Sequence, residues 1–255
     1  MKNKSPLLEY DPDRNAILNP NDVVKPLDIP QHAVLCFFNN EIHKLNQKGL
    51  LRPLKKLRSE MGTHIVYAMK HGQQDVVLLH PGMGASFAAV LFEELIALGC
   101  RKFIACGGAG VLDQAISMGH LLVPDTAIRD EGTSFHYLPP AREVHASEEA
   151  VNAIEDTLRR QQVPFTRGKT WTTDAIYRET PAKIASRKSE GCLTVEMEAA
   201  ALFAVAQFRG VKIGQILYAG DDVSGTEWDS RSWVKQSEIR QKLIYLAAEA
   251  CLQIQ

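Results

Sequence analysis

Short apolar runs alternate with helix-like segments along almost the whole chain, and this alternation constrains the fold most strongly. Residues 32–38 (HAVLCFF) and 102–106 (KFIAC) are dense apolar runs typical of buried strands. Residues 86–99 instead have the spacing of a helix that ends at Gly99. Such alternation predicts an α/β protein: a three-layer sandwich in which helices flank a central mixed, largely parallel sheet.

The remaining segments fit the same scheme. We expect a hairpin over residues 63–82 with Gly72 in its turn, further strands at 120–128, 165–173, 192–197 and 212–220, and further helices at 40–50, 147–162, 198–210 and 237–254. Residues 1–30 are rich in proline and asparagine and have no clear period, so we expect an irregular N-terminal arm. Residues 31–255 contain no linker or repeat, which predicts one domain.

The composition excludes several classes of protein. The 255 residues are 45% hydrophobic and 23% charged, and the net charge is -1, which disfavours nucleic-acid binding. The five cysteines are scattered without a CxxC pair, as expected for buried, reduced thiols. The N-terminus lacks the apolar core of a signal peptide, and no apolar run approaches the length of a membrane span. We therefore expect a cytoplasmic protein without nucleic-acid or membrane partners.

Polar and glycine residues follow five of the predicted strands. In an open α/β sheet, ligands bind beyond the carboxyl ends of the strands, so these residues are expected to share one site. They are Gly82 and Gly84, Gly107 and Gly108, Thr172 to Asp174, Glu196 to Glu198, and Asp221 with Asp222.

Each of these features also has a structural interpretation. GMG (82–84) and GGAG (107–110) could be tight strand-to-helix turns, and neither matches a P-loop or GxGxxG. Glu196 and Glu198 could be acids of a first helical turn, a position that stabilises each by roughly 0.3–1 kcal/mol. The carboxylates could bind a hard cation, but the dispersed histidines and the lack of HExxH predict no metal site. The lack of GxSxG argues against a serine hydrolase.

Over roughly residues 75–225, the chain resembles the nucleoside phosphorylase/nucleosidase superfamily, and within it the uridine-phosphorylase-like group. The most specific motif is VEMEAAALFAVA at 195–206. PGMGASFAAVLFEELIALG at 81–99, RDEGTSFHYLPP at 129–140 and TWTTDAIYRET at 170–180 take the places of further family segments. The resemblance implies an enzyme, a pentosyltransferase that uses phosphate as co-substrate and needs no cofactor.

The resemblance also implies roles for individual residues. Glu198 would accept hydrogen bonds from ribose hydroxyls, Met197 would pack on the sugar, and Glu196 would orient the site. A carboxylate suits this task because it only accepts, and a diol can donate twice. Asp221 would act as a general acid toward the base of a purine nucleoside.

The base and phosphate contacts are less sharply indicated. Thr172 and Thr173 lie in the segment expected to contact the base. Phe135 and Trp171 could stack on a base or belong to the core, and Arg178 could contact a base, bind a phosphate or pair with Glu179 on the surface. The resemblance implies phosphate contacts from Gly82, Gly84, Gly107 and Gly108.

The chain departs from the family where phosphate should bind. Residues 37–45 (FFNNEIHKL) lack the family's early arginine, Ala105 stands where a second arginine is expected, and Gly108 replaces a hydroxyl residue. Arg129, Arg178, or Arg52 and Arg58 of a neighbouring subunit of a homodimer or homohexamer could substitute. The sequence therefore predicts a nucleoside phosphorylase, with a nucleosidase that uses water, or a non-catalytic nucleoside or nucleotide sensor, as alternatives.

Overall fold

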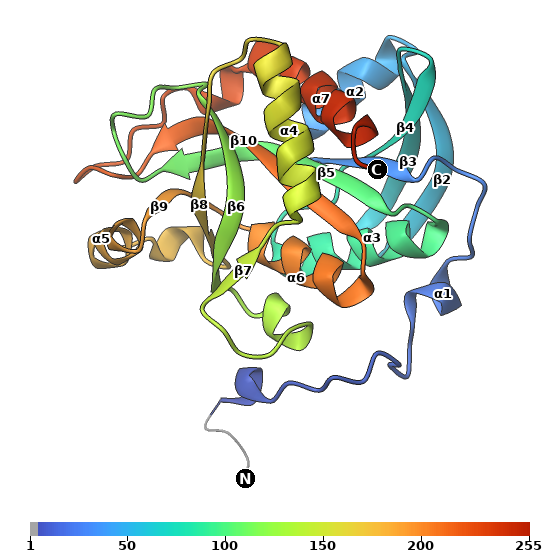
Figure 1. Ribbon diagram of the computed structural model, residues 1–255, viewed down its shortest axis with the longest axis horizontal. Helices are drawn as coiled ribbons and strands as arrows, with labels where there is room; N and C mark the ends of the chain where they lie inside the picture. The colour runs from blue at the N-terminus through green and yellow to red at the C-terminus, as the bar shows by residue number, and fades with distance from the viewer. Residues whose placement is uncertain (1–4) are drawn as a thin grey trace.

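A mixed sheet with helices on both faces forms the molecule, as Figure 1 shows for the computed structural model, which describes residues 5–255. The strand order is β10-β6-β8-β9-β5-β1-β4-β3-β2, and β7 pairs with β6. This confirms the predicted α/β fold with a central mixed sheet. The strands are β1 His32–Cys36, β2 Leu51–Ser59, β3 Gly62–His71, β4 Gln74–Leu79, β5 Lys102–Val111, β6 Leu121–Asp130, β7 Glu143–His145, β8 Phe165–Thr173, β9 Cys192–Glu196 and β10 Lys212–Asp222.

The helices lie on the two faces of the sheet and bury two apolar clusters. They are α1 Pro20–Val23, α2 Asn39–Gln47, α3 Ala85–Leu98, α4 Glu148–Arg160, α5 Pro181–Ser189, α6 Ala199–Arg209 and α7 Ser237–Leu252. Helices α3 and α6 pack on one face, where Phe92 meets Phe103 edge to face with 4.7 Å between ring centroids. Helices α2, α4 and α7 pack on the other face. Helix α6 is alanine-rich and almost wholly buried, so its N-terminus is held inside the protein.

Part of the sheet closes on itself. Strand β5 pairs with β10 and with β9, β10 pairs with β6, β6 with β8, and β8 with β9. These five strands form a closed ring, and β1, β4, β3 and β2 extend from it as an open sheet. The ring brings the ends of strands from distant parts of the sequence together, which the alternation of elements alone does not predict.

The glycine-rich segment 107–110 and the acidic pair Asp221 and Asp222 lie inside strands rather than after them. The sequence pattern allows a turn at 107–110, and that interpretation is wrong because these residues belong to β5. Asp221 and Asp222 likewise end β10. The glycines serve close packing: a Cβ on Gly108 would lie 3.0 Å from the Tyr218 ring, tighter than ordinary contact.

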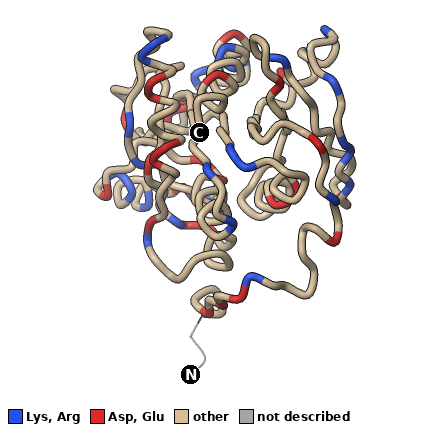
Figure 2. The backbone as a smooth tube through the Cα atoms, turned by 45° about the vertical axis from the view of Figure 1, so that its right-hand side comes forward, with Lys and Arg blue, Asp and Glu red and all other residues tan. Residues whose placement is uncertain are grey.

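The N-terminal segment, the charges and the cysteines complete the description. Residues 5–31 contain two short helical pieces, and the first four residues of the predicted arm lie outside the described residues. Lys and Arg are interspersed with Asp and Glu along the chain rather than gathered on one face (Figure 2). All five cysteines are buried and unpaired, as predicted. No helix in residues 5–255 is long and apolar enough to cross a membrane.

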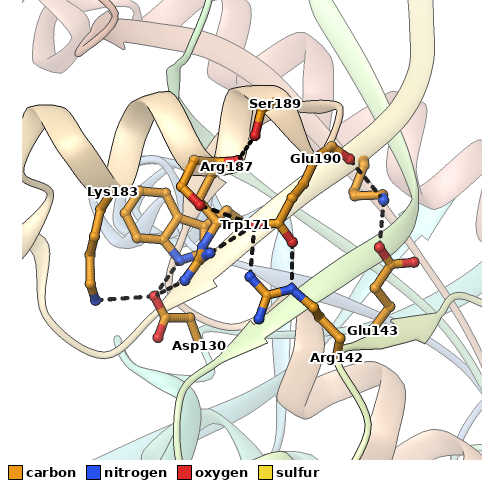
Figure 3. A network of polar contacts seen from close by, with 10 residues as sticks. Asp130, Arg142, Glu143, Trp171, Lys183, Arg187, Ser189 and Glu190 are labelled. Atoms are coloured by element: carbon orange, nitrogen blue, oxygen red, sulfur yellow. Dashed lines mark hydrogen bonds and ion pairs between the residues drawn. The ribbon is translucent and has the colours of Figure 1, made fainter.

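A polar network holds α5 against β6 and β8 (Figure 3). Asp130 Oδ2 accepts hydrogen bonds from Trp171 Nε1 (3.0 Å), Lys183 Nζ (3.2 Å) and Arg187 Nη2 (3.0 Å). Arg187 also donates to Glu190, just past the end of α5. Trp171 is completely buried in this network, so of its two interpretations the core position is the one observed.

Candidate active site

A cavity of about 950 Å³ opens where the ring of strands meets the loops after β1, β4 and β8. Its volume suits a small-molecule ligand, since ligand pockets usually measure roughly 300–1,000 Å³. Its wall contains Phe37 and Phe38, residues of the GMG and GGAG segments, the end of β9 and the end of β10. The cavity brings together these predicted site residues: Gly82, Gly107, Gly108, Glu196, Met197, Glu198 and Asp221.

Glu196 lines the cavity, but its carboxylate is committed to the start of α6. Oε2 accepts the backbone N–H groups of Glu198 (2.7 Å) and Ala199 (2.6 Å), and Oε1 accepts the hydroxyl of Thr172 (2.6 Å). Thr172 in turn accepts the backbone N–H of Ala200 (2.9 Å). These bonds satisfy N–H groups that a helix start leaves free. Burial nevertheless raises the pKa of Glu196 above its usual range.

Glu198 lies at the N-terminus of α6, and only backbone N–H groups contact its carboxylate among residues 5–255. Oε1 accepts the backbone N–H of Gly84 at 2.6 Å, and no lysine or arginine of residues 5–255 pairs with it. The residue is 6% exposed. Burial, and then the neighbouring Glu196, raise the pKa of Glu198 well above its usual range. A buried carboxylate without a cation is costly to the free protein.

The two consecutive aspartates at the end of β10 do different things. Asp222 is buried, forms an ion pair with Arg231, and accepts the backbone N–H of Ser224 at 2.8 Å. Asp221 lines the cavity, and its Oδ2 accepts the indole N–H of Trp228 at 2.7 Å. Of the two, Asp221 is therefore the one that lines the cavity.

Glu179 lines the same cavity and was not anticipated from the sequence as a site residue. No residue in the described chain forms a hydrogen bond or ion pair with its carboxylate. Burial, and then the negative charge of Asp221, raise the pKa of Glu179 to about 7. The sequence feature that could have identified Glu179 is its position in the loop after β8. Arg178, its neighbour, is exposed and does not line the cavity, and the ion pair considered for the two is not present.

The remaining candidate base contacts lie outside the cavity wall. Thr172 supports Glu196 from behind, and Thr173 Oγ1 accepts the backbone N–H of Ala175 at 3.2 Å. The guanidinium carbon of Arg129 lies over the ring of Phe135, 4.3 Å from the centroid of that ring. Arg129 is itself buried, and its three nitrogens donate within the loop that follows β6. The structure therefore brings none of these side chains to the cavity.

The backbone groups proposed for phosphate are largely occupied. The N–H of Gly82 donates to His80 Nδ1 at 3.2 Å, and the N–H of Gly84 donates to Glu198. Gly84 does not line the cavity, whereas Gly107 and Gly108 do so from within β5. An anion nest built from these glycines would require the bonds at Gly82 and Gly84 to change.

Positive charge is scarce around the cavity. Among the described residues of its wall, Arg240 is the one arginine, and no lysine lines it. Arg240 donates from Nε (3.1 Å) and Nη2 (3.0 Å) to the hydroxyl of Tyr218. Of the other candidate cations, Arg52 pairs with Asp75 at 3.1 Å, and Arg58 is exposed on β2. Residues 5–255 contain no cluster of three side chains suited to a metal ion.

Comparison with known proteins places the chain in a family. The model of the phosphorylase superfamily matches residues 31–253, so the protein belongs to that superfamily. Guanosine phosphorylase of Halorubrum lacusprofundi is 32% identical over 158 residues, which are 60% of this chain and 64% of that relative. Uridine phosphorylase of Haemophilus influenzae is 24% identical, over 70% of this chain and 77% of its own length. The chain thus aligns with slightly less than two thirds of the guanosine phosphorylase.

Solved structures share the fold. Uridine phosphorylase from Vibrio fischeri superposes with a TM-score of 0.72 at 23% identity and covers 93% of each chain. AMP nucleosidase from Bacteroides thetaiotaomicron superposes with a TM-score of 0.71 at 22% identity, over 88% of this chain and 87% of its own. The α/β architecture with a central mixed sheet is therefore that of these enzymes.

Proposed function

We propose that the protein is a nucleoside phosphorylase, which cleaves the N-glycosidic bond of a purine or pyrimidine nucleoside with phosphate to give the free base and (deoxy)ribose 1-phosphate. The observation that carries this proposal is the carboxylate of Glu198, which is buried in the cavity wall and has no cation partner among residues 5–255. Matching relatives named guanosine, uridine and purine nucleoside phosphorylase support it.

The sugar fits the part of the cavity beside α6. Glu198 keeps unused acceptor capacity beyond its bond from Gly84, and a ribose diol supplies two donors. Met197, between the two glutamates, lines the cavity and offers an apolar surface to the sugar ring. Glu196 holds the backbone of Glu198 by accepting its N–H, so its role is to orient the ribose-binding carboxylate.

The base fits the opposite part of the wall, beside β10. Asp221 is positioned there to share or donate a proton as a purine base leaves, which lowers the charge on the leaving group. The negative charges of the cavity would stabilise the cationic character of a sugar that loses its base. Phosphate would attack the sugar carbon from the other face.

A second candidate function is hydrolysis, in which water replaces phosphate. The observation that favours it is the cavity wall itself, where Arg240 is committed to Tyr218 and phosphate would lack the bidentate cations that bind it strongly. The nucleosidase and the phosphorylase differ only in this part of the site.

The assembly and location follow the same proposal. We propose a cytoplasmic homodimer or homohexamer that needs no cofactor, in which Arg52 or Arg58 of one protomer supplies charge to its partner's site. Analytical ultracentrifugation checks this, and a fully active monomer would contradict it.

Base release from a panel of purine and pyrimidine nucleosides, with and without phosphate, tests the proposed function. Release that requires phosphate and yields ribose 1-phosphate supports the phosphorylase. Release that ignores phosphate and yields free ribose establishes the nucleosidase instead. Binding without release across the panel establishes a sensor.

A further inference from the structure

The loop between β10 and α7 brings two tryptophans to the cavity and is fixed at its base. Trp228 and Trp233 both line the cavity. Asp222 and Asp229 exchange backbone hydrogen bonds of 2.8 and 3.1 Å. Arg231 forms an ion pair with Asp222 and donates to the carbonyl of Ile116 at 2.7 Å. Trp228, which is 63% exposed, therefore directly precedes the fixed base of the loop at Asp229.

The two oxygens of Asp221 have different surroundings. Oδ2 accepts the indole N–H of Trp228 at 2.7 Å. Oδ1 lies above Gly110 in the cavity wall, where a Cβ would come within 3.6 Å of it. Within residues 5–255, no group forms a hydrogen bond with Oδ1. The carboxylate thus has one oxygen bound by the loop and one oxygen, beside Gly110 of the cavity wall, without a hydrogen-bond partner among the described residues.

The indole group favours one oxygen of Asp221 as the site of a proton. An indole N–H only donates, so the oxygen bound to it must act as an acceptor. A proton on Asp221 is then favoured on Oδ1, the oxygen beside Gly110 of the cavity wall. The other titratable groups near Asp221 are Glu179 and Tyr218. Neither has a hydrogen bond to it, so Trp228 is its one fixed partner among the described residues.

We propose that Trp228 is a positioning residue, which fixes Oδ2 of Asp221 so that Oδ1 delivers its proton to the departing base. This inference rests on the proposed function, in which Asp221 is the acid. It makes Trp228 important for purine nucleosides, whose base leaves with the help of a proton. The ring of Trp228 also lines the cavity, so its N–H and its aromatic surface must be separated in the test.

The test combines three variants in a double-mutant cycle with guanosine as substrate. Trp228→Phe keeps an aromatic ring and removes the donor, so we expect kcat to fall about tenfold while KM changes less than about twofold. Combined with Asp221→Asn, Trp228→Phe should produce no further loss, because the two residues act as a unit. Glu227→Gln, at an exposed neighbouring position, should leave kcat unchanged. An unchanged kcat in Trp228→Phe, or equal losses in both backgrounds, would overturn the inference.

A spectroscopic readout separates this inference from the proposed function. The indole N–H resonance of Trp228, identified by its absence in Trp228→Phe, should shift in Asp221→Asn and stay in place in Glu227→Gln. A resonance indifferent to Asp221→Asn refutes the contact whether or not the enzyme turns over. No base release from the wild-type protein refutes the proposed function, whereas wild-type release that Trp228→Phe retains in full refutes only the role of Trp228.

Discussion

Acidic side chains have cationic partners in the network around α5 but lack them in the cavity wall, as far as residues 5–255 show. Asp130 accepts three hydrogen bonds from Trp171, Lys183 and Arg187 in the network that holds α5, and these donors keep the pKa of Asp130 below its usual range although burial opposes them (Figure 3). Glu179 and Glu198 have no cation partner in the part of the chain that the structure describes, and burial raises the pKa of both. Carboxylates of the first kind stabilise the fold, and those of the second kind reduce stability and remain available to a ligand.

Among the carboxylates of the cavity, we expect the largest loss of activity on substitution of Asp221. Asp221→Asn removes the proton donor while keeping the size of the side chain, so we expect kcat for purine nucleosides to fall by about 10²–10⁴-fold. Pyrimidine nucleosides should lose less. Steady-state kinetics with guanosine and uridine measure both, and an equal loss for the two would remove Asp221 as the acid.

A somewhat smaller effect is expected at Glu198. Glu198→Gln weakens two charge-assisted hydrogen bonds to ribose, each worth about 1.5–3 kcal/mol, so kcat/KM should fall by about 10²–10³-fold. Thermal unfolding should occur at the same temperature or a higher one, because the substitution removes a buried ionisable group that has no cation partner among residues 5–255. Full activity with lowered stability would instead show that Glu198, like Asp130, stabilises the fold.

At Asp130 we expect the opposite pattern, in which stability falls and activity is retained. Asp130→Asn weakens the acceptor of three donors and leaves Arg187 with less compensation, so we expect about 1–3 kcal/mol of destabilisation in urea unfolding. Activity per folded molecule should remain. Asp156→Asn, which removes an exposed ion pair with Arg159 (3.0 Å), is a matched control expected to change stability by less than about 0.5 kcal/mol. Loss of turnover without loss of stability would show that the network serves the site.

The last comparison is the pH dependence of stability, whose sign differs between the two regions. Hydrogen bonds from Arg142, against the smaller effect of burial, lower the pKa of Glu190 to about 2, so its contribution is present above its ordinary value of about 4.3 and is lost as pH falls toward 2. Burial raises the pKa of Glu198 to about 8, so its contribution is present below about 4.3 and is lost as pH rises through 8.

Unfolding free energies measured from pH 2 to pH 9 check this prediction. The decrease between pH 5 and pH 9 should become smaller in Glu198→Gln, whereas the decrease below pH 4 should be unaffected. Nucleoside affinity should change in the opposite sense, since the ionised form of Glu198 is the better acceptor. A decrease of equal size in both proteins on the alkaline side would contradict the assignment.

The sequence predicted the layers of this fold well because its apolar periodicity is strong. The helix over 86–99 and the hairpin around Gly72 lie where the pattern placed them. Strand β2 escaped prediction because four of its nine residues, LRPLKKLRS, are charged and it lies at a sheet edge, where a strand need not be apolar. Helix α5 has little buried surface and depends on its polar network, which periodicity does not reveal.

The candidate site was predicted in part. Glu198 and Asp221 could be found because each follows or ends a strand at the same side of the sheet. Glu179 was missed because its neighbour Arg178 offered a plausible surface ion pair, and only the fold shows that the carboxylate faces the cavity. Phe135 was considered as a base contact, but the buried guanidinium of Arg129 stacks on its ring, and the sequence did not reveal this contact.

The closed ring of strands has a consequence for how the chain folds. Strand β10 completes the ring by pairing with β5, which ends about a hundred residues earlier in the chain, and with β6. Pairings between such distant segments have a high entropic cost before they become favourable, and they slow folding. During synthesis, the cavity cannot exist until residue 222 has left the ribosome, because its wall depends on the last strand. Folding of the nascent chain and acquisition of a binding site should therefore be nearly simultaneous events.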